Sequence, residues 1–314
     1  MFARKILPLC SLLLACAAVM PVPVTHAAAA APVAASQARL ELASTSALVV
    51  DLSNGGEIYS SLPDVVVPIA SITKLMTAIV VLDARQPMDE LLTVTIRDTH
   101  ELKNVFSRVR VDSQLSRREL LRLALMSSEN RTASALAHHY PGGHAAFVAA
   151  MNAKARELGM TRTRFAEPTG LSAMNVSTAR ELVTLLKASR EYPAIREMST
   201  FPNGDAFFRK PNYALSFFNT NPLVRKGDWN IHVSKTGFTN AAGHCLVMLA
   251  DVNQRPVAMV LLDSYGKQSR FGDATRLRNW MEHGRPAVIP EVARNYKQQK
   301  SQQLRQLAVS SLSN

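Results

Sequence analysis

Cysteine is scarce in this 314-residue sequence. Two of its three cysteines, Cys10 and Cys16, lie within the first 27 residues, which leaves Cys245 alone in the remainder. A single thiol excludes an internal disulfide there, so a hydrophobic core must supply the stability of the fold. Because Cys245 lies in the apolar run 245–249, it is predicted to be a buried hydrophobic residue and not a nucleophile.

Several catalytic patterns are absent as well. No Gly-x-Ser-x-Gly turn occurs, and no glycine-rich phosphate loop is present. The eight histidines show no zinc-ligand spacing, because the adjacent His138 and His139 would point in different directions from a helix. We therefore expect no metal and no other cofactor.

Acidic residues are fewer than basic ones, at 24 Asp and Glu against 36 Lys and Arg, a net charge of +12. Apolar residues make up 47% and charged residues 19%, which is typical of a globular chain with a sizeable core. In a cytosolic protein the basic excess would indicate a nucleic-acid partner. The N-terminus argues against that location, so no nucleic acid is expected.

The segment 1–27 has the pattern of a secretory signal peptide. Arg4 and Lys5 give it a positive start, residues 6–20 are almost uninterruptedly apolar, and Ala27 supplies a small residue for cleavage. Its removal would leave 34 basic against 24 acidic residues, a net charge of +10. This charge favours acidic polymers of the cell wall, although solubility alone would explain it equally well.

Two other fates of this segment are less favoured. A retained membrane anchor is disfavoured because the apolar run is short for a bilayer and is closed by Pro21 and Pro23. Lipidation at Cys16 is disfavoured because Leu14 fits the required pattern poorly. We expect a periplasmic protein with at most loose membrane association.

The remaining pattern predicts an α+β fold. A linker at 28–37 precedes a folded domain at 38–284, and a basic polar tail at 285–314 is expected to be flexible. Strands are predicted at 47–52, 57–60, 231–236, 245–251 and 257–263. Helices are predicted at 71–84, 116–127, 130–139, 144–158, 177–189 and 270–283. We expect the N-terminal and C-terminal strands to pair in one antiparallel sheet, with a helical cluster between them in sequence.

Three short polar motifs occur in order along the chain. They are Ser71-Ile72-Thr73-Lys74, Ser128-Glu129-Asn130 and Lys235-Thr236-Gly237. Ser128 follows Ser71 by 57 residues, and Lys235 follows Ser128 by 107. Each motif alone occurs by chance in many proteins, whereas all three together, each on the element that its chemistry needs, form a specific pattern.

The first motif combines a nucleophile with a base. Residues three apart in a helix share a face, so Lys74 can reach the hydroxyl of Ser71. Serine is a weak nucleophile until a base accepts its proton, and Lys74 can do so if partial burial and the nearby Lys235 keep it neutral. At a helix N-terminus, the backbone N–H of Ser71 would also face developing negative charge.

The second motif is predicted to handle the leaving group. Ser128 lies between two helical segments, where it can relay a proton between Lys74 and a leaving amine. Asn130 can hold both Lys74 and a substrate amide by hydrogen bonds.

The third motif is predicted to lie on a strand that binds substrate. Lys235 would supply a cation for a substrate carboxylate and Thr236 a hydroxyl, while Gly237 would let a peptide backbone approach the strand. The N–H of Phe238 is expected to form an oxyanion hole with that of Ser71.

In this order the motifs resemble the signature of penicillin-binding proteins and serine β-lactamases. The stretches 70–77, 125–143 and 232–245 are similar to the low-molecular-mass D-alanyl-D-alanine peptidases, in their endopeptidase branch of penicillin-binding protein 7. The resemblance covers residues 38–284 as the catalytic domain. It implies a transpeptidase-like fold, acylation of Ser71 by a peptidoglycan stem peptide or a β-lactam antibiotic, and hydrolysis of the acyl-enzyme. Glu129 departs from the glycine or aspartate common in relatives.

The predicted activity is that of a serine DD-endopeptidase, because the tail resembles neither the β-domain nor the anchoring helix of many carboxypeptidase relatives. A DD-carboxypeptidase that removes terminal D-alanine is the alternative. A class A β-lactamase is less favoured: Glu167 lies 39 residues after Ser128, but the asparagine expected after it is missing, so Glu167 is predicted to be a structural turn residue. A wall-binding protein without catalysis would not require three intact motifs.

Overall fold

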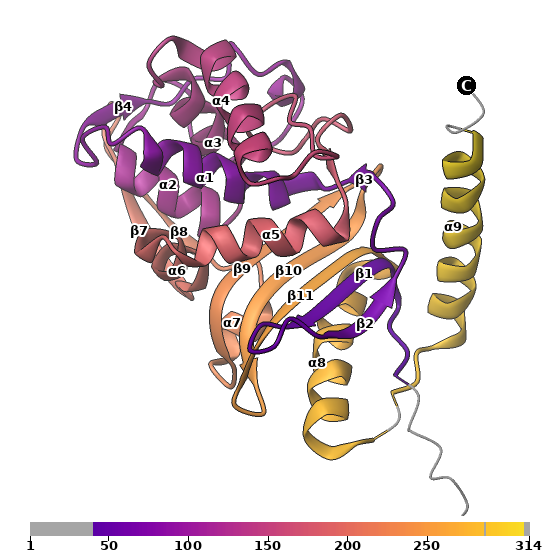
Figure 1. Ribbon diagram of the computed structural model, residues 1–314. Helices are drawn as coiled ribbons and strands as arrows, with labels where there is room; N and C mark the ends of the chain where they lie inside the picture. Colours follow the sequence, from indigo (N-terminus) through magenta and orange to yellow (C-terminus); the bar gives the residue numbers. More distant parts are fainter. Residues whose placement is uncertain (1–39, 286, 311–314) are drawn as a thin grey trace, which may run out of the picture. The chain divides into compact units, whose positions relative to one another are not determined.

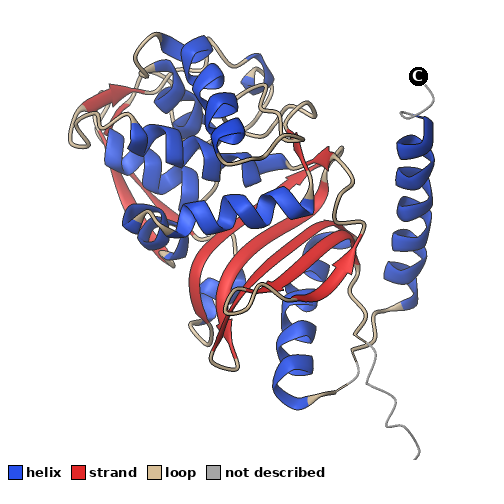
Figure 2. Cartoon of the chain, viewed as in Figure 1, coloured by secondary structure: helices blue, strands red, loops and turns tan. Residues whose placement is uncertain are grey.

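The computed structural model describes residues 40–285 and 287–310, which belong to one compact unit, Gln37–Asn314 (Figure 1). The predicted signal peptide at 1–27 and the linker at 28–37 lie outside the described residues. The described chain combines a five-stranded sheet with helices, so the predicted α+β class is confirmed (Figure 2).

The sheet joins strands from the two ends of the chain. Its strands are β1 (Ser44–Asp51), β2 (Glu57–Ser61), β9 (Asn230–Thr239), β10 (Gly243–Val252) and β11 (Arg255–Ser264). Their order is β2-β1-β11-β10-β9, and all neighbours are antiparallel. The turn predicted between the last two strands is confirmed at Asn253 and Gln254, whose φ values of 49° and 60° are those of a tight hairpin turn. Because β9 is an edge strand, one side of its backbone is left for other partners.

Successive residues of each strand face opposite sides of the sheet, and both sides are covered by helices. From β10, Val247 and Leu249 join one hydrophobic core, whereas Leu246 and Met248 join another. The helix α5 (Ala179–Arg190) packs on the first side and α8 (Gly266–His283) on the second (Figure 1). This double burial explains why the strand sequences are almost continuously apolar.

The helices predicted in the middle of the chain are present. They are α2 (Arg117–Met126), α3 (Asn130–His138), α4 (Gly143–Glu157) and α5. Ser116 caps α2 by accepting a hydrogen bond from the N–H of Glu119, whereas the Glu119 carboxylate is bonded to Arg122. The helix α5 begins at Ala179, two residues later than predicted, and Thr178 caps it by accepting the N–H of Glu181.

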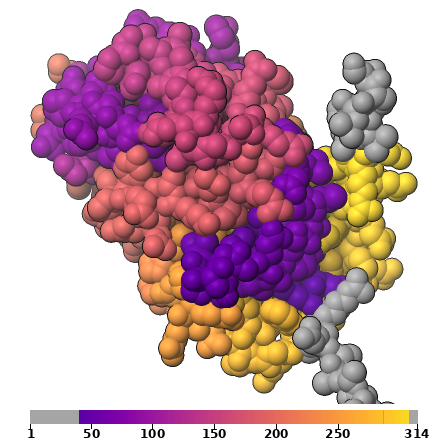
Figure 3. Space-filling view, viewed as in Figure 1, coloured from indigo at the N-terminus to yellow at the C-terminus, as the bar shows by residue number. Residues whose placement is uncertain are grey.

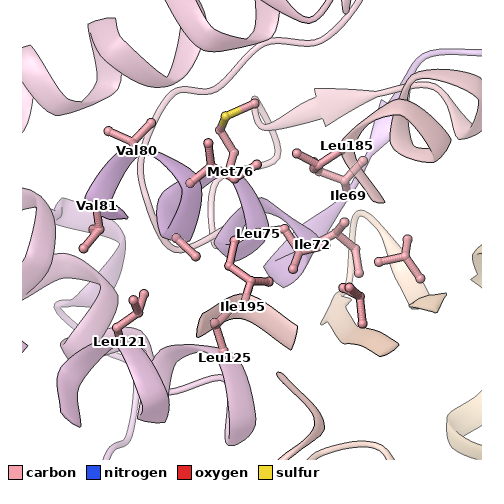
Figure 4. Packing of buried hydrophobic residues seen from close by; sticks show 14 of the residues in the cluster. Ile69, Ile72, Leu75, Met76, Val80, Val81, Leu121, Leu125, Leu185 and Ile195 are labelled. Carbon is pink, nitrogen blue, oxygen red and sulfur yellow. The ribbon is translucent and has the colours of Figure 1, made fainter. Parts of the chain in front are cut away.

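The helix α1 (Thr73–Asp83) runs through the centre of the helical part of the domain. The sequence predicts one apolar face, but the structure buries every residue from Thr73 to Val81. Figure 4 shows Leu75, Met76, Val80 and Val81 of α1 among Leu121 and Leu125 of α2, Leu185 of α5 and Ile195 of α6. A helix enclosed by other helices can be apolar all round, and its rigid setting fixes the residues at its start.

Several short elements were not predicted. They are β3 (Val67–Pro68), β4 (Leu91–Thr93), η2 (His100–Leu102), β5 (Gln114–Ser116), β6 (Val176–Ser177), α6 (Pro193–Thr200), β7 (Asn203–Phe208), β8 (Tyr213–Phe218) and α7 (Pro222–Lys226). The hairpin β7–β8 buries Phe208 and Phe217 on one side but exposes Phe207 and Phe218 on the other. Apolar residues on both sides hide the alternation that identifies a strand.

The described part of the C-terminal tail is largely helical, contrary to the prediction of a flexible segment. Residues Glu291–Ser310 form the helix α9, which lies beside the N-terminal strands (Figure 3). Ala293 is buried, Lys297 Nζ donates hydrogen bonds to Leu42 O and Tyr59 Oη, and Tyr296 donates to Asp263. The contacts of Lys297 span 255 and 238 residues of sequence and that of Tyr296 spans 33, so the polar composition of the tail could not reveal them.

Candidate active site

Ser71 lies in a short 3₁₀ turn, η1 (Ala70–Ile72), directly before α1. The predicted α-helix from Ser71 therefore begins two residues later, at Thr73. Ala70 has a φ of 48°, a left-handed conformation that costs a non-glycine residue about 1–2 kcal/mol. This turn interrupts the regular helix and sets Ser71 at the start of α1, with Lys74 one turn further on.

Two glycines press against this turn. A Cβ atom on Gly170, whose φ is 85°, would lie 2.0 Å from the carbonyl oxygen of Ala70 and 2.7 Å from the backbone nitrogen of Ser71. A Cβ atom on Gly237 would lie 3.1 Å from the same nitrogen. Gly237 was expected to admit a substrate backbone; in the structure its missing side chain first of all lets β9 approach Ser71.

Lys74 is completely buried and its amino group has three neighbours. Its Nζ atom lies 3.0 Å from Ser71 Oγ, and it donates to Asn130 Oδ1 at 2.7 Å and to the carbonyl oxygen of Thr169 at 2.6 Å. Asn130 Oδ1 and the carbonyl of Thr169 can only accept, so they take two N–H groups of the amine. The third bonding position of Lys74 Nζ points at Ser71 Oγ. It carries a hydrogen when the amine is charged and a lone pair when the amine is neutral.

Burial lowers the pKa of Lys74 to about 8, against the opposing charges of Glu167 and Glu129, which raise it. Lys74 was expected to be neutral, with Lys235 helping to keep it so. At a pKa of about 8, roughly one molecule in ten has the neutral amine at pH 7. The charge repulsion between the two lysines instead lowers the pKa of Lys235. Burial is the larger cause, and the charges of Lys74 and Arg270 add to it, so the pKa of Lys235 lies well below its usual value.

The second motif lies at the start of α3, opposite the first. Lys235 Nζ donates to Ser128 Oγ at 2.8 Å and to the carbonyl oxygen of Thr236 at 2.9 Å. The predicted relay placed Ser128 beside Lys74, whereas its hydroxyl is bonded to Lys235. Ser128 has a φ of 60°, a left-handed conformation that directs the chain back into α3 and aims the hydroxyl at β9.

Glu129, whose role the sequence left open, caps α3. Its carboxylate accepts the N–H of Arg131 at 3.1 Å and the hydroxyl of Ser107 at 2.8 Å. Asn130 is the first residue of α3, so the cap fixes the amide that holds Lys74.

The third motif lies entirely on β9. Thr236 Oγ1 donates to Thr220 Oγ1 at 2.6 Å, and Lys235 and Thr236 are both nearly buried. Phe238 is half exposed and stacks on His244 of β10, with ring centroids 4.2 Å apart. The structure thus brings Ser71, Lys74, Ser128, Asn130, Lys235, Thr236, Gly237 and Phe238 into one neighbourhood.

Arg270 is a neighbouring cation that the sequence analysis did not identify. It lies on α8, is nearly buried, and its Nε atom has no hydrogen-bond partner among the described residues. Its charge lowers the pKa values of Lys235 and His244, and burial lowers its own pKa to about 10. A lone arginine in a helix pattern carries no signal of function, and only the packing of α8 on the sheet brings it here.

Comparisons with known proteins agree with this geometry. A family model described as D-alanyl-D-alanine carboxypeptidase matches residues 31–266. The chain belongs to this family. It is 56% identical over 289 residues to a D-alanyl-D-alanine endopeptidase of Escherichia coli K12, covering 92% of this chain and 93% of the relative. It is 59% identical over 263 residues to a D-alanyl-D-alanine endopeptidase of Pseudomonas aeruginosa, covering 84% and 85%.

A solved structure extends the comparison to the fold. Penicillin-binding protein D2 of Listeria monocytogenes, in its cefotaxime-bound form, superposes with a TM-score of 0.67 at 29% identity, covering 78% of this chain and 98% of that one. The predicted transpeptidase-like fold and the resemblance to low-molecular-mass penicillin-binding proteins are confirmed. Membership of the family also confirms the prediction of an enzyme, a serine-type D-Ala-D-Ala peptidase.

Glu167 was predicted to be a structural residue, and its contacts agree with that interpretation. It is 2% exposed, and its carboxylate accepts hydrogen bonds from the N–H groups of Thr169, Gly170 and Ser172 and from Asn175 Nδ2. The carboxylate therefore holds the turn whose Thr169 carbonyl binds Lys74 and whose Gly170 presses on Ser71.

We expect Glu167→Gln to lower thermal stability without prolonging the penicilloyl adduct. In the variant, the side-chain amide nitrogen would face N–H donors whose hydrogen bonds a carboxylate oxygen accepts in the unaltered enzyme. Such a loss should lower the free energy of unfolding by about 1–3 kcal/mol. The adduct lifetime, measured by mass spectrometry, should change less than about threefold, since no deacylation base is lost. The exposed Glu197→Gln is the matched control. A lifetime that rises tenfold or more would identify Glu167 as a deacylation base.

Proposed function

We propose that the protein is a serine DD-endopeptidase that hydrolyses D-alanyl cross-links in peptidoglycan through an acyl-enzyme on Ser71. The contact between the buried Lys74 Nζ and Ser71 Oγ is the observation that carries the proposal. It supplies a nucleophile with a base whose pKa burial has brought near neutral pH.

In the acylation step, neutral Lys74 accepts the proton of Ser71 while Ser71 Oγ forms a bond to the D-alanyl carbonyl carbon. The N–H groups of Ser71 and Phe238 stabilise the charge on the carbonyl oxygen; the close approach of Gly237 to Ser71 supports this pairing. The C–N bond then breaks, and the proton passes from Lys74 to the leaving amine. Ser128 is the relay in this proposal once its hydroxyl turns from Lys235, its partner in the free enzyme, toward Lys74. In deacylation a water takes the place of the amine: Lys74 accepts its proton while its oxygen bonds to the acyl carbon. The bond from that carbon to Ser71 Oγ then breaks, the proton returns from Lys74 to Ser71, and the peptide leaves as a carboxylic acid.

Substrate carboxylates would bind on the β9 side of the site. Lys235 and Thr236 line this strand, and Arg270 adds an incompletely paired guanidinium nearby. A carboxylate placed among these cations would raise the pKa of Lys235, which burial and the charges of Lys74 and Arg270 hold well below its usual value. A β-lactam antibiotic has both the reactive carbonyl and such a carboxylate, so we expect it to acylate Ser71 also.

The periplasm is the proposed location. The family acts on D-alanyl peptides, which are wall components outside the cytoplasm, and the N-terminal pattern predicts export. Within residues 40–285 and 287–310, no helix is long and apolar enough to cross a membrane. The net charge of +10 on the processed chain favours contact with the anionic wall.

The test of endopeptidase against carboxypeptidase is digestion of two purified substrates, dimeric cross-linked muropeptides and monomeric pentapeptides. We expect dimers to become monomers at least about tenfold faster than pentapeptides lose D-alanine. The names of the two relatives described above motivate this direction. Fast release of D-alanine with the dimers intact would establish the carboxypeptidase alternative instead.

A further inference from the structure

A short rim beside the second motif, residues 105–110, is fixed to the catalytic machinery at one end. Ser107 Oγ donates to the carboxylate of Glu129 at 2.8 Å and accepts the N–H of Val109 at 3.0 Å. Arg131 of α3 donates to the carbonyl oxygen of Val109. Two residues of α3's first turn therefore hold the rim next to Ser128 and Asn130.

At its other end the rim is fixed to the hairpin β7–β8. Arg108 Nη2 donates to the carbonyl oxygen of Ser216 at 2.7 Å, and its guanidinium lies 5.0 Å from the ring centre of Phe217. The N–H of Arg110 donates to Tyr213 Oη at 2.9 Å. Four residues beyond Ser216, the chain reaches Thr220, which bonds Thr236 of the third motif. The rim thus spans from the second motif toward the third.

The exposed groups of the rim have a consistent chemistry. Phe106 is 87% exposed, and Nε and Nη1 of the exposed Arg108 have no hydrogen-bond partner within the described chain. Lys103, Arg108 and Arg110 are basic, and residues 103–110 include no acidic one. Of the nearby carboxylates, Glu129 is bonded to Ser107 and Asp205 to Ser216, so neither neutralises Arg108 through a direct contact. The rim therefore presents an apolar ring and a guanidinium with two unbonded nitrogens and no acidic partner to an anionic, partly apolar ligand.

We propose that this rim binds the amine-bearing stem of a cross-linked substrate, the part that leaves when the D-alanyl bond is cut. The inference rests on the proposed function. Ser128, as the relay, faces the leaving amine, and the rim lies directly beyond it, joined through Glu129. In a carboxypeptidase the leaving group is a single D-alanine, which ends near Ser128. In an endopeptidase it is a whole stem peptide with free carboxylates, which needs a surface beyond Ser128.

Glu129 acts in this scheme as a positioning residue. Glycine at this place could not bind Ser107, so the rim would keep only the contact between Arg131 and Val109 as its tie to α3. The carboxylate links the surface that would bind the second stem to the helix whose first residue, Asn130, holds Lys74.

The test compares Phe106→Ala and Arg108→Ala with the unaltered enzyme on three reactions: cleavage of dimeric muropeptides, release of D-alanine from pentapeptides and acylation by penicillin. We expect kcat/KM for dimers to fall about tenfold in either variant, while the other two rates stay within about twofold. The matched controls are Phe207→Ala, whose exposed side chain lies on the face of the hairpin opposite Phe217, and Arg118→Ala, at an exposed arginine of α2. Both should leave all three rates unchanged.

Phe106 makes no packing contact that its removal would disturb, so Phe106→Ala keeps the test valid if Arg108→Ala loosens the hairpin. Unchanged cleavage of dimers in Phe106→Ala and Arg108→Ala overturns the proposal, and so does an equal fall in all three rates. If the unaltered enzyme leaves dimers intact and removes D-alanine from pentapeptides, the proposed function and the proposed role of the rim are both wrong. That result is recognised before any variant is made.

Discussion

Replacing Ser71 by alanine is expected to abolish covalent labelling by penicillin. The acylation rate should fall by at least about 10⁴-fold, because the variant lacks the hydroxyl that lies beside the buried base Lys74. Incubation with a fluorescent penicillin, followed by mass spectrometry of the digested protein, measures both the rate and the modified residue.

The Ser71→Ala protein should still fold. Ser71 is partly exposed and its hydroxyl is hydrogen-bonded to Lys74, so its loss should change the free energy of unfolding by no more than about 1 kcal/mol. Ser60→Ala, at an exposed serine of β2, is the control for the substitution itself. An adduct on another residue, or labelling that persists in Ser71→Ala, would show that the nucleophile is wrongly assigned.

Replacing Lys74 is expected to have a comparable effect on acylation. Lys74→Ala removes the base, and the rate should fall by about 10³-fold or more because the nucleophile and its base act as a unit. Lys74→Arg retains hydrogen-bond donors but cannot release a proton near neutral pH, so we expect it to be equally inactive. Lys187→Ala, at an exposed lysine of α5, should acylate normally.

The pH dependence separates a base from a merely structural lysine. The active form of Lys74 is the neutral amine, and its pKa is lowered to about 8 by burial. The neutral fraction is nearly complete above that pH and falls about tenfold for each pH unit well below it. We expect the acylation rate of the unaltered enzyme to rise from pH 6 and level off above pH 8. A rate independent of pH over this interval, or near-normal acylation in Lys74→Ala, would contradict the assignment.

The sequence was sufficient for the parts of the site that depend on neighbours in the chain. The spacing of Ser71 and Lys74 places them on one side of a helical turn whatever the rest of the fold does, since helix geometry is local. Likewise, the β-branched runs predict β9, β10 and β11, and the polar pair Asn253-Gln254 predicts their turn. The family resemblance then linked the motifs, although no local rule connects Ser71 with Ser128 or Lys235.

Other features of the fold escaped prediction because their cause is tertiary. The helix α9 is held by contacts of Tyr296 and Lys297 with residues more than 30 and 230 positions away, so its polar sequence indicated a free tail. The hairpin β7–β8 has apolar residues on both sides, which conceals the two-residue period of a strand.

The sequence alone determined which residue types carry the chemistry, because side-chain reactivity and helical spacing are properties of the residues and their near neighbours. Only the tertiary structure decided how those residues behave. Burial set the pKa of Lys74, packing placed Arg270 beside the third motif, and Gly170 and Gly237 allowed three distant backbones to meet at Ser71. Electrostatic free energy and close packing depend on every group that surrounds a site, and those groups come from elements far apart along the chain.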